Sequence, residues 1–458
     1  MILFGFLWAC TEIIKKPEFP TSVIVIGGGP AGLATATRIN NQYGVLVLEA
    51  EKELGGKQRY TQKPEFLFVG SSTQKQNGIT DDIAAVRSDW RLLSGIESND
   101  IVEDFLNHNI EIHDWLIQNG IEFEAPIPHK FGHVPRQHLV KDNSFLPLFL
   151  SKATKSPNIT IQKNTHVQDI LIENSEIKGV QLDDGTYVYA SVVVIASGGF
   201  TNNPAILSDV LQSNSTTPTH WVPSQYQTGQ GEALLWSQKY DFVTENTDKI
   251  GYMCNGIATS NDPLFFPNAK PPLIFVNSNG TRFVNEEDLG RSHVFRKLLR
   301  MKEYEESFVA IAPLHALSQQ ISDIQKFQDA QKSGNIYCSD RYSDISNHTK
   351  MPLSSLQQSI QNIRQGKKDS LGRSEFPLFE GQICTFDIVC SAQKTYGGLH
   401  LDPSSRQVLK LNKEPIQGLY AVGAAHDLQM GIFDGSLSAF IWTSWKTADQ
   451  INRILELK

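Results

Sequence analysis

The chain has 458 residues and a formal net charge of −8 at pH 7, from 41 Lys and Arg against 49 Asp and Glu. Hydrophobic residues make up 40% of it, a composition typical of folded proteins that excludes disorder and fibrous repeats. A pI near 5.9 provides no basic field for phosphate backbones, so nucleic-acid binding is not expected. At roughly 100–200 residues per domain, the chain has room for two or three domains.

The first nine residues, MILFGFLWA, are apolar and precede Cys10. A run this short cannot cross a membrane, which takes about 20 residues. A small residue before a cysteine resembles the end of a bacterial lipoprotein signal, in which Cys10 would carry the lipid, although no Lys or Arg precedes the run. Residues 1–19 are therefore either the signal and tether of an exported, membrane-anchored protein, or an apolar tail or leading strand that packs on the core of a cytoplasmic one.

The other cysteines are Cys254, Cys338, Cys384 and Cys390, and no two of them form a Cys-x-x-Cys pair. This spacing argues against zinc, iron–sulfur and c-type haem sites, so no metal is expected. Four cysteines permit disulfides in an oxidising compartment and fit buried thiols equally well.

The first predicted strand, residues 22–26 (SVIVI), is typical of a strand buried on both faces of a parallel sheet. A helix-forming segment follows it, and Gly27, Gly29 and Gly32 in between have the spacing G-x-G-x-x-G. The first glycine permits a tight turn, the second lets a pyrophosphate approach the backbone, and the third lets the helix pack on the strand. The helix start, with Ala31 in its first turn, offers unpaired N–H groups to phosphates.

The second predicted strand, residues 45–48, ends at Glu49, whose carboxylate can accept both hydroxyls of a ribose. Strand, glycine turn, helix, strand and acidic residue in this order predict an α/β fold with a Rossmann-type dinucleotide-binding domain. Gly55 and Gly56 form a second glycine pair just beyond the acid. NAD and FAD share this fingerprint, so the rest of the chain decides between them.

With that pair, the chain resembles the FAD-binding superfamily of fumarate reductase and succinate dehydrogenase flavoproteins. Residues 69–81 (VGSSTQKQNGITD) are similar to its A-G-T-x-x-Q-x-x-x-G-I-x-D, and residues 192–200 (VVVIASGGF) to its V-V-L-A-T-G-G-F. Residues 418–423 (GLYAVG) resemble its G-L-Y-A-x-G strand, and a helix expected from about residue 436 to 452 would point its N-terminus at the flavin. The resemblance implies FAD as the cofactor, bound by Gly27, Gly29, Ala31, Gly32, Glu49, Gly55, Gly56, Gly70, Ser71, Val167, Ser197, Gly198, Gly423, Ser436 and Leu437.

Three segments between these motifs, residues 166–172, 176–182 and 187–195, alternate or run apolar and predict a β-meander that feeds a buried strand. The sequence has no second strand–GxGxxG–helix unit, so a dedicated NAD(P)H domain is not expected. Electrons then come from the small-molecule substrate or pass to and from an external electron donor or acceptor.

The middle of the chain, residues 241–375, loses the buried-strand pattern and predicts an inserted α+β cap domain. The flavin domain then comprises residues 20–240 and 376–458. Residues 272–286 (PLIFVNSNGTRFVNE) resemble the superfamily's V-N-x-x-G-x-R-F-x-N-E and predict a hairpin with an Asn-Gly turn.

Arg291 lies nine residues after Arg282, where the resemblance places an arginine that delivers a proton to a substrate carbon. A guanidinium keeps its proton above pH 12, so this role needs a carboxylate relay. Glu286, Glu287 and Asp288 are close enough in sequence to provide it. The alternative is a salt-bridged arginine at the start of a helix.

Two residues of the superfamily's dicarboxylate clamp differ in this chain. Lys394 stands where the superfamily has a histidine, and Asp434 where it has the clamping arginine. Exchanging Arg for Asp replaces attraction by repulsion, each about 1–4 kcal/mol at 4 Å, so fumarate and succinate are not expected as substrates. Lys394 and Asp434 either pair with each other or set substrate choice. His426, after the flavin strand, either faces the flavin or caps a turn.

These features favour an FAD-dependent oxidoreductase that exchanges a hydride between flavin N5 and a C–C single or double bond of a non-dicarboxylate. Arg291, Glu286, Lys394 and Asp434 are the candidate catalytic residues. One alternative is a flavin oxidase or dehydrogenase of an amine or amino acid, in which Asp434 would pair with the ammonium group. Another is a non-catalytic flavoprotein that relays electrons.

Overall fold

The structure is a computed structural model that describes residues 21–61, 63–94, 100–128, 134–212, 221–222, 228–259, 263–265, 272–286, 308–321, 323–364, 370–373, 376–428 and 437–457. Several predicted residues lie outside these ranges, namely the N-terminal segment with Cys10, Glu287, Asp288, Arg291, Asp434 and Ser436.

The chain divides into two compact units. Unit 1 comprises the chain up to Gly198, residues 235–243 and the chain from Leu399 onward, and unit 2 comprises residues 199–234 and 244–398. Unit 2 thus includes residues 199–234 and 376–398, which the sequence analysis assigns to the flavin domain.

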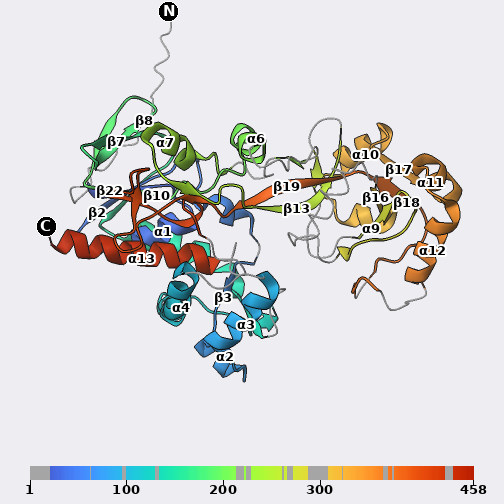
Figure 1. Cartoon of the computed structure of the whole chain (residues 1–458), viewed down its shortest axis with the longest axis horizontal. Coiled ribbons are helices and arrows are strands. Elements are labelled where there is room, and N and C mark those ends of the chain that lie inside the picture. The colour runs from blue at the N-terminus through green and yellow to red at the C-terminus, as the bar shows by residue number, and fades with distance from the viewer. Residues whose placement is uncertain are drawn as a thin grey trace, which may run out of the picture. The chain divides into compact units, whose positions relative to one another are not determined.

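Unit 1 is built on a sheet whose central strands run parallel in the order β6-β2-β1-β10-β22. Figure 1 labels β2, β10 and β22 of this sheet. Every residue of β2 and of β10 is buried, as expected of strands covered on both faces. The predicted α/β class with a parallel sheet is therefore confirmed. The bounds are β1 Thr21–Ile26, β2 Gly44–Leu48, β6 Ile159–Gln162, β10 Val192–Ile195 and β22 Pro415–Ala421.

Helices that pack against one another form a layer beside this sheet. Helix α1 (Pro30–Arg38) packs against α13 (Leu437–Glu456) and α5 (Phe145–Lys155), and α13 also packs on α4 (Asp100–Gln118). Figure 1 shows α13 extending along this layer, with α1 and α4 beside it. Its apolar face includes the buried Trp442, which meets the ring of Phe105 edge to face at 6.3 Å.

An antiparallel meander joins the same sheet. Strands β7 (Val167–Glu173), β8 (Glu176–Leu182) and β9 (Tyr187–Tyr189) pair in succession and lead into β10, as the sequence predicts. Strand β21 (Gln407–Leu409) also belongs to this sheet and pairs antiparallel with β22. Two short 3₁₀ helices complete this part, η1 (Gly56–Tyr60) and η4 (Gly423–Ala425).

Unit 1 also contains a small sheet in the order β3-β5-β4. The bounds of its strands and of the other helices of this region are β3 Glu65–Leu67, β4 Ile127–Pro128, β5 Pro135–Leu139, α2 Ser72–Gln76, α3 Ile83–Ser94 and η2 Lys141–Asn143.

Unit 2 contains a four-stranded antiparallel sheet in the order β15-β16-β18-β17, and helices follow its strands in sequence. Their bounds are β15 Ile274–Asn277, β16 Phe308–Pro313, β17 Ile336–Ser339, β18 Ile383–Phe386, α9 Leu314–Gln319, α10 Ile324–Lys332, α11 Tyr342–Thr349 and α12 Leu353–Arg364. A second sheet and a helix have bounds β11 Trp221–Val222, β13 Ile250–Ile257, β14 Leu264–Phe265, β19 Ile388–Thr395 and α6 Pro204–Gln212. Three elements lie at the unit boundaries of the sequence, α7 Glu232–Tyr240, β12 Thr244–Glu245 and β20 Gly398–Leu399.

Two cysteines of unit 2 form a disulfide. Cys338 on β17 and Cys384 on β18 are register partners across antiparallel strands, and their sulfurs are bonded. For this pair the structure decides between the thiol and disulfide interpretations in favour of the disulfide.

Among the described residues, no helix combines the length and apolar character that crossing a bilayer requires.

Candidate functional site

The glycine turn between β1 and α1 has three glycines with different surroundings. Gly27 has φ +105°, and a Cβ there would lie 2.5 Å from the carbonyl oxygen of Ala196. A Cβ on Gly32 would lie 2.0 Å from the oxygen of Gly27, so helix and turn are in contact there. A Cβ on Gly29 would meet no heavy atom within 4 Å. The backbone at Gly29 is therefore open to an approaching ligand.

Helix α1 begins without a side-chain cap. Gly29 is its N-cap residue and Pro30 occupies its first turn, so no cap side chain bonds the first N–H groups. These groups and the positive end of the helix dipole favour an anion at this position.

The carboxylate of Glu49 lies beside the same turn and is 8% exposed. Its Oε2 accepts a hydrogen bond from the Gly28 N–H at 2.8 Å, and its Oε1 accepts one from the Glu51 N–H at 2.9 Å. Each oxygen keeps a second lone pair, which fits acceptance of two ribose hydroxyls. The Glu49 carbonyl accepts the Thr165 N–H at 2.9 Å, and Val167, the first residue of β7, follows two residues after Thr165.

The second glycine pair packs against the first turn. The Gly55 N–H donates to the Gly28 carbonyl at 2.8 Å, and a Cβ on Gly56 would lie 3.5 Å from the Cα of Gly29. Gln58, in the 3₁₀ helix that follows, is buried, and its Nε2 has no hydrogen-bond partner in the described part of the chain.

The C-terminal helix holds two of these segments together. Gly423, with φ +65°, donates its N–H to Thr443 Oγ1 at 2.9 Å, and a Cβ there would lie 2.7 Å from the Cβ of Ala31. The hydroxyl of Ser444 donates to the Ala31 carbonyl at 2.9 Å. Helix α13 therefore fixes Gly423 against the start of α1.

The start of α13 is tied to the segment that leads to Gly70 and Ser71. Ser438, next to Leu437, accepts the Leu67 N–H at 2.7 Å and donates to the Leu67 carbonyl at 2.9 Å. Gly70 has φ +68°, and Ser71 caps α2 by accepting the Gln74 N–H at 3.0 Å. Leu437, Gly70 and Ser71, predicted from distant parts of the sequence, thus lie in one connected region.

Ser197 and Gly198 follow directly after β10, beside β1 in the sheet. Ser197 Oγ is buried and has no partner among the described residues, and a Cβ on Gly198, with φ +85°, would meet no heavy atom within 4 Å. Open backbone at Gly29 and Gly198, orphaned polar atoms on Gln58 and Ser197, and a carboxylate with free lone pairs fit an extended dinucleotide. All predicted cofactor residues within the described ranges belong to unit 1.

A family model described as "FAD binding domain" matches residues 22–436. The chain belongs to this family. FAD is therefore its cofactor, and the predicted resemblance to fumarate reductase-type flavoproteins is confirmed.

Curated relatives and solved structures agree with this family. The chain is 23% identical to NADH:acrylate oxidoreductase of Vibrio harveyi, covering 89% of this chain and 48% of the relative, so it spans about half that protein's length. It is 25% identical to fumarate reductase of Schizosaccharomyces pombe over 88% of this chain and 83% of the relative. A flavocytochrome c3 fumarate reductase in its open conformation superposes with a TM-score of 0.72 at 17% identity, covering 95% of this chain and 79% of that one. A 3-ketosteroid delta1-dehydrogenase from Sterolibacterium denitrificans superposes with a TM-score of 0.74 at 15% identity, covering 95% and 99%.

Of the candidate catalytic residues, the described ranges contain Glu286 and Lys394, both in unit 2. Glu286 is fully buried, and its carboxylate accepts hydrogen bonds from Arg282 Nε at 3.0 Å, from Arg373 Nη1 at 3.0 Å and from the Phe275 N–H at 3.0 Å. The segment after β15 turns back at Asn277 and Gly280, but its return arm forms only an isolated bridge between Val276 and Arg282. Lys394 lies on β19 opposite Gly251 of β13.

Sequence patterns do not identify a buried polar network beside Ser71. Arg136, 2% exposed, binds Asp81 with Nε and Nη2, each at 2.8 Å, and pairs with Asp89 through Nη1. His138 shares a hydrogen bond with Ser71 Oγ at 2.8 Å, and burial lowers the pKa of this histidine to about 4. The signal in the sequence is only an Arg-x-His spacing on an alternating strand, which does not distinguish buried from exposed positions.

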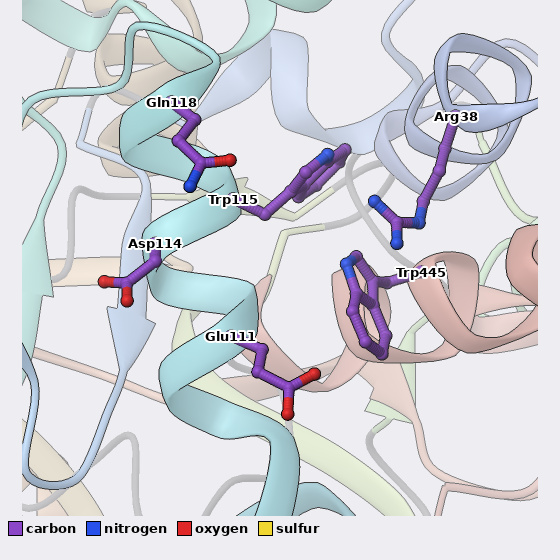
Figure 2. A pocket seen from close by; sticks show the side chains of 6 residues that line it. All are labelled: Arg38, Glu111, Asp114, Trp115, Gln118 and Trp445. Carbon is purple, nitrogen blue, oxygen red and sulfur yellow. The ribbon is translucent and has the colours of Figure 1, made fainter.

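A surface pocket lies at the other end of α1 from the glycine turn (Figure 2). The guanidinium of Arg38, the last residue of α1, lies between Trp115 and Trp445, with Cζ 5.5 and 4.5 Å from their ring centroids. Arg38 also binds Asp449, with its Nε and Nη2 at 2.8 and 2.9 Å from the two carboxylate oxygens. At 1.5 Å per residue, α1 separates this pocket from Gly29 by roughly 13 Å, so it is distinct from the cofactor site.

Proposed function

We propose that the protein is an FAD-dependent oxidoreductase that moves a hydride between the flavin and one carbon of a C–C single or double bond in a small molecule. The observation that carries the proposal is the open glycine turn with Glu49 beside it, in a chain whose FAD-family match spans residues 22–436. Relatives named for fumarate and acrylate reduction support C–C chemistry. An external electron donor or acceptor completes the cycle.

The chain's own residues bind and orient the cofactor. FAD, when bound, supplies two-electron hydride chemistry. Gly29 and the start of α1 would hold the pyrophosphate, Glu49 would accept the ribose hydroxyls, and the positive end of α13 at Leu437 would stabilise negative charge on the flavin.

We infer that the substrate carries fewer than two carboxylates. Lys394 and Asp434 replace the histidine and arginine with which the superfamily's dicarboxylate reductases hold their substrate. An aspartate at that position repels a carboxylate, which disfavours fumarate and succinate. A relative named for acrylate, a monocarboxylate, supports a small unsaturated substrate of this kind.

For the proton that accompanies hydride transfer, we propose Arg291 as the donor, in the predicted cap of residues 241–375. Both oxygens of Glu286 are engaged by guanidinium groups. Glu286 therefore acts as a positioning residue for the segment that leads to Arg291, and the reprotonating relay falls to Glu287 or Asp288.

Two variants test these assignments. Arg291→Lys keeps the charge but loses the reach of the guanidinium fork, so we expect FAD to remain bound and reducible while turnover falls by about 10²–10⁴-fold. Asp434→Arg restores the positive charge that dicarboxylate reductases have at this position, so the variant should gain affinity for fumarate while losing the native substrate. Unchanged turnover in Arg291→Lys would make Arg291 structural, and fumarate binding in the unmodified protein would refute the substrate class.

We also propose that Cys10 is lipidated and anchors the protein to a membrane on the oxidising side. The disulfide between Cys338 and Cys384 supports this location, because disulfides persist in oxidising compartments. Cys10→Ser should release the protein from the membrane fraction, and recovery of the wild type in the cytosol with an intact Met1 would contradict the proposal.

A further inference from the structure

A partly buried arginine of unit 1 has two buried nitrogens without a partner in the described part of the chain. Arg406 precedes β21, and its Nε and Nη2 are buried yet have no hydrogen-bond partner within the described ranges. Its Cζ lies 5.2 Å from the ring centroid of Trp442 on α13. An unpaired buried charge is strongly unfavourable, so this side chain points to a ligand that the described chain does not supply.

The two free nitrogens form the edge of a guanidinium that binds both oxygens of a carboxylate. This chain uses the same edge elsewhere. Nε and Nη2 of Arg136 bind the two oxygens of Asp81 at 2.8 Å, and those of Arg38 bind Asp449 at 2.8 and 2.9 Å. In Arg406 the equivalent edge faces no acceptor from any residue that the structure describes.

Other unpartnered polar atoms belong to residues near Arg406. His426 is 2% exposed, and its Nε2 has no partner in the described part of the chain. The indole Nε1 of Trp442 and the hydroxyl of Tyr420 are also buried and unpartnered there. Tyr420 is the register partner of Gln407, which follows Arg406 in the chain. Guanidinium, indole and phenol all offer hydrogen-bond donors, which suits a ligand made of acceptors.

The charges around Arg406 favour an anion. Burial lowers the pKa of Arg406 to about 10 and the charge of Asp104 raises it, so the guanidinium is protonated at neutral pH. Asp104 is itself paired, with Lys446 Nζ and His108 Nδ1 each at 3.2 Å. Burial, followed by the charge of Arg406, lowers the pKa of His426 to about 3, so its ring is neutral.

The backbone of Arg406 is strained as well, with φ +63° in the left-handed region. Strain and an unpaired buried charge in one residue persist where a function requires them.

We propose that Arg406, against the ring of Trp442, forms a binding site for an oxyanion, either a carboxylate or a phosphate group. The Nε and Nη2 edge of Arg406 binds two of its oxygens. The site does not depend on the proposed C–C chemistry.

Thermal unfolding tests the site in the FAD-free and FAD-loaded protein, titrated with sodium propionate or inorganic phosphate against sodium chloride at equal ionic strength. We expect a saturable rise in Tm with at least one anion, and a roughly tenfold or larger loss of that affinity in Arg406→Asn, because asparagine tolerates the backbone but lacks the charged edge. Lys413→Asn is the matched control, since Lys413 has φ +65° but is exposed.

The two sources of the oxyanion give different results, and both support the site. A response to propionate in the FAD-loaded protein assigns it to a small-molecule carboxylate. A response to phosphate and not to propionate, in the FAD-free and the FAD-loaded protein alike, assigns it to a phosphate-bearing ligand other than the cofactor.

Two results would overturn the proposal. One is the absence of any saturable response in the wild type, or an equal response in Arg406→Asn. The other is measured without added anion. We expect Arg406→Asn to raise the Tm by more than Lys413→Asn does, because it removes a buried unpaired charge as well as backbone strain. A loss of Tm instead would make Arg406 a structural residue.

Discussion

At the residue scale, the glycines of the first turn have separable roles. Gly29 has φ −74° and open space where a Cβ would stand, so a side chain there leaves the fold intact and blocks only the ligand. Gly32 has the oxygen of Gly27 2.0 Å from the position of its Cβ, so a side chain there forces backbone apart.

We therefore expect Gly29→Val to keep its far-ultraviolet circular dichroism and FAD-free Tm but to lose at least roughly 100-fold in FAD affinity, because two or more charge-assisted hydrogen bonds are lost at about 1.5–3 kcal/mol each. Gly32→Ala should instead lower the Tm of the FAD-free protein. Tight FAD binding by Gly29→Val would show that the pyrophosphate lies elsewhere.

The residues that sequence patterns identify are those with local signals. The turn Gly27 to Gly32 and Glu49 belong to one strand–helix–strand unit whose chemistry depends on spacing alone. Arg406 has no such signal, because an arginine in a polar turn before a short strand is typical of a surface position. Only tertiary packing, with Trp442 beside it, buries the nitrogens of its guanidinium.

At the element scale, β5 carries the buried His138 into the network with Ser71. Burial lowers its pKa to about 4, below the value of about 6.5 in an unfolded chain, so the unfolded state takes up the proton first. This histidine's contribution to stability is complete above about pH 6.5 and is lost as the pH falls toward 4.

We expect His138 alone to lower the free energy of unfolding by about 3 kcal/mol between pH 7 and pH 4. His138→Gln is the comparison, because glutamine keeps a group able to bond Ser71. Denaturant titrations at several pH values give the free energy of unfolding of both proteins, and the difference between their pH dependences measures the contribution of His138. Parallel pH profiles for the two proteins would refute a neutral buried His138.

The strand pair β17 and β18 is cross-linked by Cys338 and Cys384, which are 46 residues apart. The chain-entropy model gives such a loop about 4 kcal/mol of stabilisation. We expect a reductant to lower the Tm of the wild type and to leave the double variant Cys338→Ala, Cys384→Ala unchanged. Equal Tm for the oxidised wild type and the double variant would contradict a stabilising bond. The sequence could not predict this pair, because the two cysteines meet through the register of β17 and β18, and their spacing in the sequence does not reveal that register.

At the scale of the whole molecule, the order of motifs along the chain predicts the class of fold, since the parallel sheet and the meander are built from successive segments. The division into units is less accessible. Residues 199–234 and 376–398 flank the predicted cap and carry no compositional change, yet they belong to unit 2 with it. Their assignment depends on long-range packing of short strands such as β11 against β19.

The central claim is that bound FAD exchanges a hydride with a C–C bond of a substrate that is not a dicarboxylate. The most direct measurement is anaerobic reoxidation of the reduced, FAD-loaded protein by single acceptors, followed by flavin absorbance and product mass. We expect rapid reoxidation by an unsaturated monocarboxylate such as acrylate, with formation of the saturated product, and slow reoxidation by fumarate. Reoxidation by fumarate alone, or by one-electron acceptors with no alkene reduced, would contradict it.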